Sequence, residues 1–200
     1  MMHPSFLRGH NLKLPNSDIQ YYPNFLSLEE ADNYLRVFMT NTLWQQDDIK
    51  VFGKIYAQPR LTALYGNNDK PYSYSNITMQ PQKFSKELTV IKRKIENLVD
   101  TEFTTCLLNL YRDGKDSNGW HSDDEKELGQ NPVIASISLG QERYFHLRNK
   151  KDKDLKHKMI LKHGSLLLMQ GETQHHWQHQ IPKTAKPISE RINLTFRVIK

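Results

Sequence analysis

The second half of the chain constrains the fold most strongly, because its apolar residues come in short runs that suit β-strands. The runs cover residues 105–111, 133–139, 143–147, 158–161, 165–169 and 191–199. Gly140, Gly164 and Gly171 separate several of these runs as turn residues. Many short strands at close spacing predict an antiparallel β-sandwich or barrel.

Two segments of the first half have helical spacing instead. Ser27 with Glu30 three residues later forms a capping box, and the apolar residues behind it predict a helix over 28–39. The apolar stripe that follows Ser85 predicts a second amphipathic helix. Residues 47–82 contain Gly, Pro and Tyr without helical periodicity, so we expect hairpins and loops there.

The size and residue usage indicate one compact domain. With 200 residues, of which 37% are hydrophobic, the chain can bury one sizeable core. The lone Cys106 excludes an internal disulfide and a zinc or iron–sulfur site built on cysteines, so a metal would need His and carboxylate ligands. Residues 1–10 lack the apolar core of a secretory signal, and no apolar run has the roughly 18 residues of a membrane span. We therefore expect a soluble intracellular protein, cytoplasmic in a bacterium and nuclear in a eukaryote.

The charge balance favours a polyanionic partner. The net charge is +6, and clustered Lys and Arg neutralise phosphates with release of counterions. The cluster consists of Arg148, Lys150, Lys151, Lys153, Lys156 and Lys158. A solvated loop explains such a cluster about equally well, so the charge alone does not identify a nucleic-acid interface.

The last apolar run, 191–199, separates into two faces if it is a strand. Ile192, Leu194, Phe196 and Val198 share one face, whereas Arg191, Asn193, Thr195 and Arg197 share the other. The ordinary explanation is a half-exposed strand with a solvated polar side. Near a metal site, two inward arginines would instead need an anionic partner, and a small dicarboxylate would supply charge-assisted contacts.

Residues 105–111 alternate in the same way. Asn109 and Tyr111 point away from Cys106 and Leu108 on this strand, so both strands could line one polar pocket. An ordinary edge strand also explains the pair. The two residues support a pocket but do not establish it.

The triple His121-Ser-Asp123 is the candidate metal motif. An imidazole and a carboxylate two residues apart on an extended segment can bind one ion, and a distal His completes a facial triad with three open positions. The sequence offers His175, His176 and His179, with His163 as a further candidate. A helical zinc pair is disfavoured because the H-E-x-x-H pattern is absent and Pro182 follows. Spacing alone does not identify the third ligand. The alternative explanation of His121-Ser-Asp123 is a chance pair on the surface.

Five segments together resemble the AlkB family, and most closely its members that repair duplex DNA. They are NLYRDG at 109–114, GWHSDDE at 119–125, HGS at 163–165, HWQHQIP at 176–182 and RINLTFR at 191–197. The resemblance implies an α+β fold with a double-stranded β-helix (jelly-roll) core, flanking helices and an outer nucleotide-recognition lid. It also implies one domain over 1–200, with the lid at about 45–84 and the catalytic core at about 102–200.

The same resemblance implies roles for individual residues. Metal ligands for Fe(II) are His121, Asp123 and His179. The residues that contact 2-oxoglutarate are Asn109, Tyr111, Arg191, Asn193 and Arg197. Arg191 pairs with the distal carboxylate of 2-oxoglutarate, and Arg197 lies near its other carboxylate. Nucleic-acid contacts fall to Phe52 as an intercalating finger, Tyr72 and Tyr74 as stacking groups, Asp124 and Glu125 at the base edge, and Arg148 and Lys153 at the phosphates.

The activity implied is oxidative demethylation of N-alkylated bases, such as 1-methyladenine and 3-methylcytosine, in DNA. It consumes O2 and is coupled to decarboxylation of 2-oxoglutarate. The expected partner is double-stranded DNA with alkylated bases, and the expected state is a monomer without membrane contact. The alternatives are an RNA demethylase on the same core, a non-catalytic nucleic-acid-binding module, and a hydroxylase of proteins or small molecules.

Overall fold

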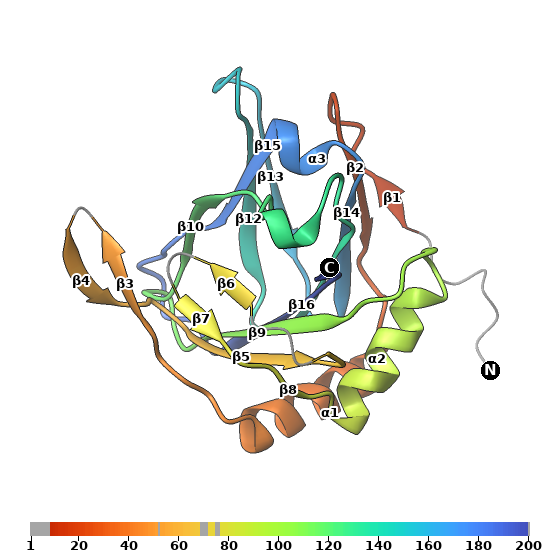
Figure 1. The fold of residues 1–200 in the computed structure, drawn as a ribbon, viewed down its shortest axis with the longest axis vertical. Helices are drawn as coiled ribbons and strands as arrows, with labels where there is room; N and C mark the ends of the chain where they lie inside the picture. The colour runs from red at the N-terminus through yellow and green to blue at the C-terminus, as the bar shows by residue number, and fades with distance from the viewer. Residues whose placement is uncertain (1–8, 52, 69–71, 75–76, 200) are drawn as a thin grey trace.

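The fold is a two-sheet β-sandwich with two long helices on one outer face (Figure 1). The computed structural model describes residues 9–51, 53–68, 72–74 and 77–199. The large sheet has the order β1-β2-β14-β11-β16-β9-β5-β8, and the small sheet has the order β10-β15-β12-β13. Neighbouring strands are antiparallel except for a two-residue parallel contact between β5 and β8. This arrangement agrees with the predicted sandwich of short strands.

The bounds of the elements are as follows. The large sheet contains β1 (His10–Asn11), β2 (Asp18–Tyr22), β14 (Ser165–Gln170), β11 (Ile134–Gly140), β16 (Arg191–Arg197), β9 (Thr105–Tyr111), β5 (Leu61–Gly66) and β8 (Gln82–Lys83). The small sheet contains β10 (Asn118–His121), β15 (Trp177–Ile181), β12 (Arg143–Asn149) and β13 (Lys156–Leu161). Two hairpins are β3 (Asp48–Val51) with β4 (Lys54–Ala57), and β6 (Tyr72–Tyr74) with β7 (Ile77–Met79). The helices are α1 (Leu28–Asn41), α2 (Lys86–Glu96) and α3 (Thr173–His176), and Lys126–Leu128 forms a 3-10 turn.

The two long helices begin where the sequence predicts. Ser27 Oγ accepts the Glu30 N–H at 3.1 Å, and the Glu30 carboxylate accepts the Ser27 N–H at 2.9 Å, which completes the capping box of α1. Ser85 Oγ caps α2 by accepting the Leu88 N–H at 3.2 Å, without the reciprocal bond of a capping box. Lys94 of α2 contacts Glu30 at 2.7 Å and ties the helices together. No helix within the described part of the chain is long and apolar enough to cross a membrane.

The core consists of two apolar layers, one on each side of the large sheet. One layer packs α1 and α2 against the sheet and includes Ile91, Leu108 and Leu194. The other fills the space between the two sheets and includes Trp177 and Leu107. All residues of β9 and β16 are buried as a result. β9 is thus an interior strand, which rules out the alternative explanation of Asn109 and Tyr111 as residues of an ordinary edge strand.

The N-terminal segment forms strands that sequence patterning does not reveal. β2 pairs with β14 from Leu166↔Tyr22 to Gln170↔Asp18, and β1 pairs with β2. Ile19 and Tyr21 of β2 enter the layer between the sheets. A five-residue strand carries too little periodicity to be recognised without its long-range partner.

Replacement of Leu194 by Ala tests the layer under the helices. Leu194 is fully buried in β16, so Leu194→Ala should lower the free energy of unfolding by about 2–5 kcal/mol through lost burial and the cavity left behind. Urea unfolding followed by circular dichroism measures the change. Leu43→Ala is the matched control, because 75% of Leu43 is exposed. Equal midpoints for the two variants would contradict this account of the core.

Candidate metal and cosubstrate site

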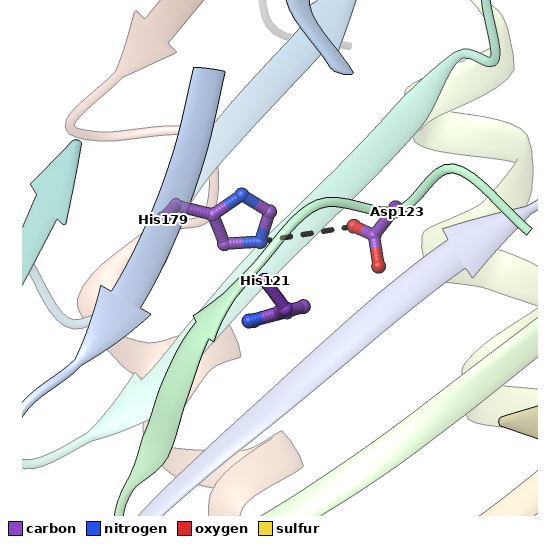
Figure 2. A group of neighbouring side chains, drawn as sticks. All are labelled: His121, Asp123 and His179. Carbon is purple, nitrogen blue, oxygen red and sulfur yellow. Dashed lines mark ion pairs between the residues drawn. The ribbon is translucent and has the colours of Figure 1, made fainter. Parts of the chain in front are cut away.

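The two histidines of the motif are brought together by strand pairing. His121 ends β10 and lies opposite His179 of β15 in the antiparallel register, while Asp123 follows β10 by two residues. One potential ligand atom from each of the three side chains lies within 4.8 Å of the other two. Figure 2 shows the three side chains converging on one point between the strands. The three residues can therefore hold one metal ion.

The protonation states of the buried pair suit a metal ligand set. Burial lowers the pKa of His179 to about 3, and the neighbouring His121 acts in the same direction. Burial alone would raise the pKa of Asp123, but the charge of Arg197 and the two imidazoles lower it to about 2. At neutral pH the cluster thus contains a neutral imidazole and a carboxylate, the forms that bind divalent metals. The 3.8 Å contact between His179 Nε2 and Asp123 Oδ2 is consequently not a pair of opposite charges.

The backbone fixes which nitrogen of His121 is free to bind. Nδ1 lies 2.8 Å from the carbonyl oxygen of Gly119, which can only accept, so Nδ1 carries the proton. Nε2 then has a lone pair, which accepts the Asn118 amide at 3.2 Å. Rotation of the Asn118 side chain would make this lone pair available to a metal.

Two polar side chains hold Asp123 in position. Arg197 donates to Oδ1 at 2.5 Å, and the Gln174 Oε1 atom accepts the Asp123 backbone N–H at 2.9 Å. Both partners are buried. The other carboxylate oxygen, Oδ2, faces His179 and is the oxygen in position to bind a metal.

The triad opens on a cavity of about 240 Å³ between the two sheets. The polar face of β16 lines this cavity through Arg191, Asn193, Thr195 and Arg197, as the alternation predicts. Asn109 and Tyr111 of β9 lie opposite Asn193 and Arg191 in the register and also line it. The eight residues predicted for metal and cosubstrate therefore surround one cavity, and Glu125 lies at it as well.

Arg191 is the group in the cavity that most clearly calls for an anion. Only 1% of Arg191 is exposed, and burial lowers the pKa of its guanidinium to about 10, so it stays charged at neutral pH. Its Nη2 atom donates to Ser138 Oγ at 2.9 Å. Its Nε and Nη1 atoms are buried without a hydrogen-bond partner within the described residues. A carboxylate would satisfy such donors, so a small dicarboxylate that also reaches the triad fits the cavity.

The remaining histidine candidates lie elsewhere. His175 Nε2 contacts Asn131, His176 lies beside Glu172, and His163 contacts Asp32 and the Gly140 N–H. Among the described residues, His179 is the histidine that joins His121 and Asp123.

The residues predicted to contact nucleic acid lie on several separate segments of the chain, and Glu125 is the one among them that lines the cavity in the described structure. Asp124 forms an ion pair with Lys150 at 2.9 Å, and Arg148 packs on Trp120. Lys153 is exposed between β12 and β13. Tyr72 and Tyr74 belong to β6, and Phe52 lies outside the described residues.

Several site residues escape sequence reasoning. Arg60 of the segment before β5 is buried and donates through Nε to Asn109 Oδ1 at 2.8 Å. Ser136 and Ser138 of β11 accept hydrogen bonds from Asn193 and Arg191. Gln174 supports the Asp123 backbone. The two serines lie on an apolar strand and are revealed by the pairing of β11 with β16, whereas Gln174 lies on α3 and is revealed by its contact with Asp123.

Comparisons with known proteins identify the family of this chain. Residues 18–197 match the 2OG-Fe(II) oxygenase superfamily. The alpha-ketoglutarate-dependent dioxygenase alkB homolog 3 of Homo sapiens is 42% identical over 197 residues, which cover 92% of this chain and 66% of that protein. The DNA oxidative demethylase ALKBH2 of Arabidopsis thaliana is 35% identical over 214 residues, which cover 92% of this chain and 67% of that protein. This chain spans 64–66% of the length of its mammalian alkB homolog 3 relatives.

A solved structure, "The structure of OsALKBH1", has the same fold. It aligns with a TM-score of 0.67 over 96% of this chain and 100% of that chain, at 16% sequence identity. The prediction of a jelly-roll core with flanking helices is confirmed. Together with the superfamily match over 18–197, the sequence identities show that this chain belongs to the AlkB family of 2OG-Fe(II) oxygenases.

Proposed function

We propose that this protein is an Fe(II)- and 2-oxoglutarate-dependent dioxygenase that removes N-linked alkyl groups from bases in DNA. The observation that carries the proposal is the single cavity shared by the triad and the unsatisfied donors of Arg191. The superfamily is defined by Fe(II) and 2-oxoglutarate, and relatives at 35–42% identity are named as dioxygenases or DNA oxidative demethylases.

In this proposal His121 Nε2, Asp123 and His179 hold the iron. The bound iron, with 2-oxoglutarate and O2, supplies the oxidation of the alkyl carbon attached to the base nitrogen. The chain's own residues prepare this site before iron arrives. Arg197 keeps Asp123 ionised and oriented, and the Gly119 carbonyl sets the tautomer of His121.

The cosubstrate would lie along the polar faces of β16 and β9. Arg191 would bind one carboxylate of 2-oxoglutarate through Nε and Nη1, at the buried end of the cavity. Asn109, Tyr111 and Asn193 line the space between Arg191 and the triad. We assign Arg197 to the triad side, where its contact with Asp123 supports the metal ligand and leaves it near the second carboxylate.

The substrate assignment rests on the residues that match nucleic-acid contacts of the AlkB family. We propose one domain over 1–200, with a nucleotide-recognition lid at about 45–84 and a catalytic core at about 102–200. Tyr72 and Tyr74 would stack on the flipped base, and Asp124 and Glu125 would contact its edge. Arg148 and Lys153 would contact phosphates, and Phe52 would fill the gap in a duplex. The protein would act as a monomer on double-stranded DNA.

Mass spectrometry of oligonucleotides that contain 1-methyladenine tests the reaction. Incubation with protein, Fe(II) and 2-oxoglutarate should remove the methyl mass and form succinate. Metal removal with a chelator, His121→Ala or Asp123→Ala should abolish both products, because each removes the metal or one of its ligands. His175→Ala is the matched control, since His175 is exposed and outside the triad, and it should retain activity. Persistence of the methyl group in both single- and double-stranded oligonucleotides would overturn the proposal.

Replacement of Arg191 tests the cosubstrate position. Arg191→Met keeps the volume but removes the charged donors, so the KM for 2-oxoglutarate should rise roughly 10- to 150-fold. The KM for the oligonucleotide should change little, because Arg191 lies at the buried end of the cavity. Steady-state succinate formation at varied 2-oxoglutarate gives the first constant, and the same assay at varied oligonucleotide gives the second. An unchanged KM for 2-oxoglutarate would place its carboxylate elsewhere.

A variant at position 52 tests the duplex preference. Because an intercalated aromatic ring offsets unstacking, Phe52→Ala should impair repair of a duplex far more than repair of a single strand. Initial rates on the same 1-methyladenine oligonucleotide, alone and annealed to its complement, provide the comparison. Phe52→Tyr retains the ring and is the control. Equal losses on both substrates would remove the finger assignment.

A further inference from the structure

The face of the small sheet that is directed away from the cavity carries aromatic and basic side chains. Alternate residues of β12 and β13 point outward, because their neighbours Phe145, Leu147 and Leu161 are buried between the sheets. The exposed Ile160 points outward opposite Tyr144. Six further outward residues, one of them from β10, are Trp120, Tyr144, His146, Arg148, Lys156 and Lys158. We call this set the basic aromatic face. None of the six carries an acidic side chain.

Cations and rings alternate on this face and contact one another. The guanidinium carbon of Arg148 lies 4.2 Å from the ring centre of Trp120, and Nζ of Lys158 lies 3.7 Å from that of Tyr144. Arg148 also donates twice to Gln178 Oε1 of β15, at 3.1 and 3.2 Å. The strand register places His146 directly beside Lys158, and Arg148 beside Lys156. The rings are thus held in place on a rigid sheet, with positive charge next to each.

The face also contains a hollow of about 240 Å³. Its lining consists of Trp120, His146, Leu147, Lys156, His157 and Lys158. The rings of Trp120 and His146 are 6.5 Å apart at 40°. Tyr144 is 46% exposed beside them. An aromatic guest can therefore reach a ring surface while its anionic neighbour meets a lysine.

We propose that the basic aromatic face binds an unpaired nucleic-acid strand, outside the cavity that takes the target base. Unpaired bases have free faces that stack on Trp and Tyr, and the phosphates between them pair with Lys and Arg. The paired part of a duplex hides its base faces, so the rings would contact only an unpaired stretch of a strand. An acidic peptide would use the cations alone, so the alternation of rings and cations favours a nucleic-acid strand.

The position of the face couples it to the cavity. β10 carries His121 toward the triad and its neighbour Trp120 outward, and β15 likewise carries His179 inward and Gln178 outward. The β12–β13 hairpin rises beyond the sheet at the top of Figure 1. A strand that delivers its modified base to the cavity could continue across this face. The inference rests on the proposed function for its substrate class, but binding to the face needs neither metal nor cosubstrate.

Fluorescence anisotropy with labelled, unmodified oligodeoxythymidylate measures binding to the face without any reaction. Tyr144→Ala should weaken binding about tenfold and leave its salt dependence unchanged, because it removes a stacking platform. Lys158→Ala should reduce the slope of log affinity against log salt by about 0.7, the contribution of one phosphate contact on a single strand. Tyr144→Phe retains the ring and should bind as the wild type does. Lys86→Ala on α2 is the charge-matched control, because Lys86 is exposed on another element.

Photo-crosslinking adds a test of position. A strand with 5-iodouracil should crosslink to Trp120 or Tyr144, as located by peptide mass spectrometry. Wild-type affinity in both Tyr144→Ala and Lys158→Ala, or crosslinks confined to other residues, overturns the proposal. If the wild type demethylates while these variants bind normally, only the face is wrong. If the wild type binds through the face but does not demethylate, the face stands and the proposed function fails.

Discussion

The buried contact between Arg197 and Asp123 is the interaction on which the site depends. Both side chains lie inside the sandwich, where an unpaired charge costs several kcal/mol. Strand β16 supplies the arginine from its interior position between β11 and β9, and the segment after β10 supplies the carboxylate. This pair links the large sheet to the small one. It also lowers the pKa of the carboxyl group, so Asp123 is ionised next to the two imidazoles at neutral pH.

The same strand shows why a polar cavity can exist inside an apolar protein. Leu194 and Phe196 of β16 pack under the helices, while Arg191 and Asn193 face the space between the sheets. The apolar layer fixes the strand, and the polar layer is satisfied in part by serine hydroxyls of β11. Donors of Arg191 remain for a ligand. These donors can bind a ligand without rearrangement, because the other face of the strand is packed rigidly.

Sequence reasoning recovers local features well and non-local pairing poorly. The capping box of α1, the start of both long helices and the alternation of β16 follow from neighbouring residues alone. α1 continues to Asn41, past the expected end, because neither glycine nor proline stops it near residue 39. The choice of His179 could not follow from spacing, since it depends on β10 pairing with a strand far along the chain. Arg60 was missed for the same reason, because it meets Asn109 across 49 residues. The family resemblance supplies the role of His179, whereas it places Arg60 in the lid pattern without a role in the cosubstrate site.

The register of β10 against β15 has a consequence for how such a sequence can change. Side chains of a strand alternate with a period of two, so a slip by one residue exchanges its faces. Here the exchange would turn His121 outward and bring Trp120 to the triad. The pairing of β10 with β15 already contains one irregularity, between Asn118 and His121. Single-residue insertions or deletions in this short stretch would therefore abolish the metal cluster even if the sheet still formed. Insertions and deletions should be tolerated in hairpin turns such as the one between β12 and β13, whereas the number of residues from Asn118 to Asp123 should stay fixed.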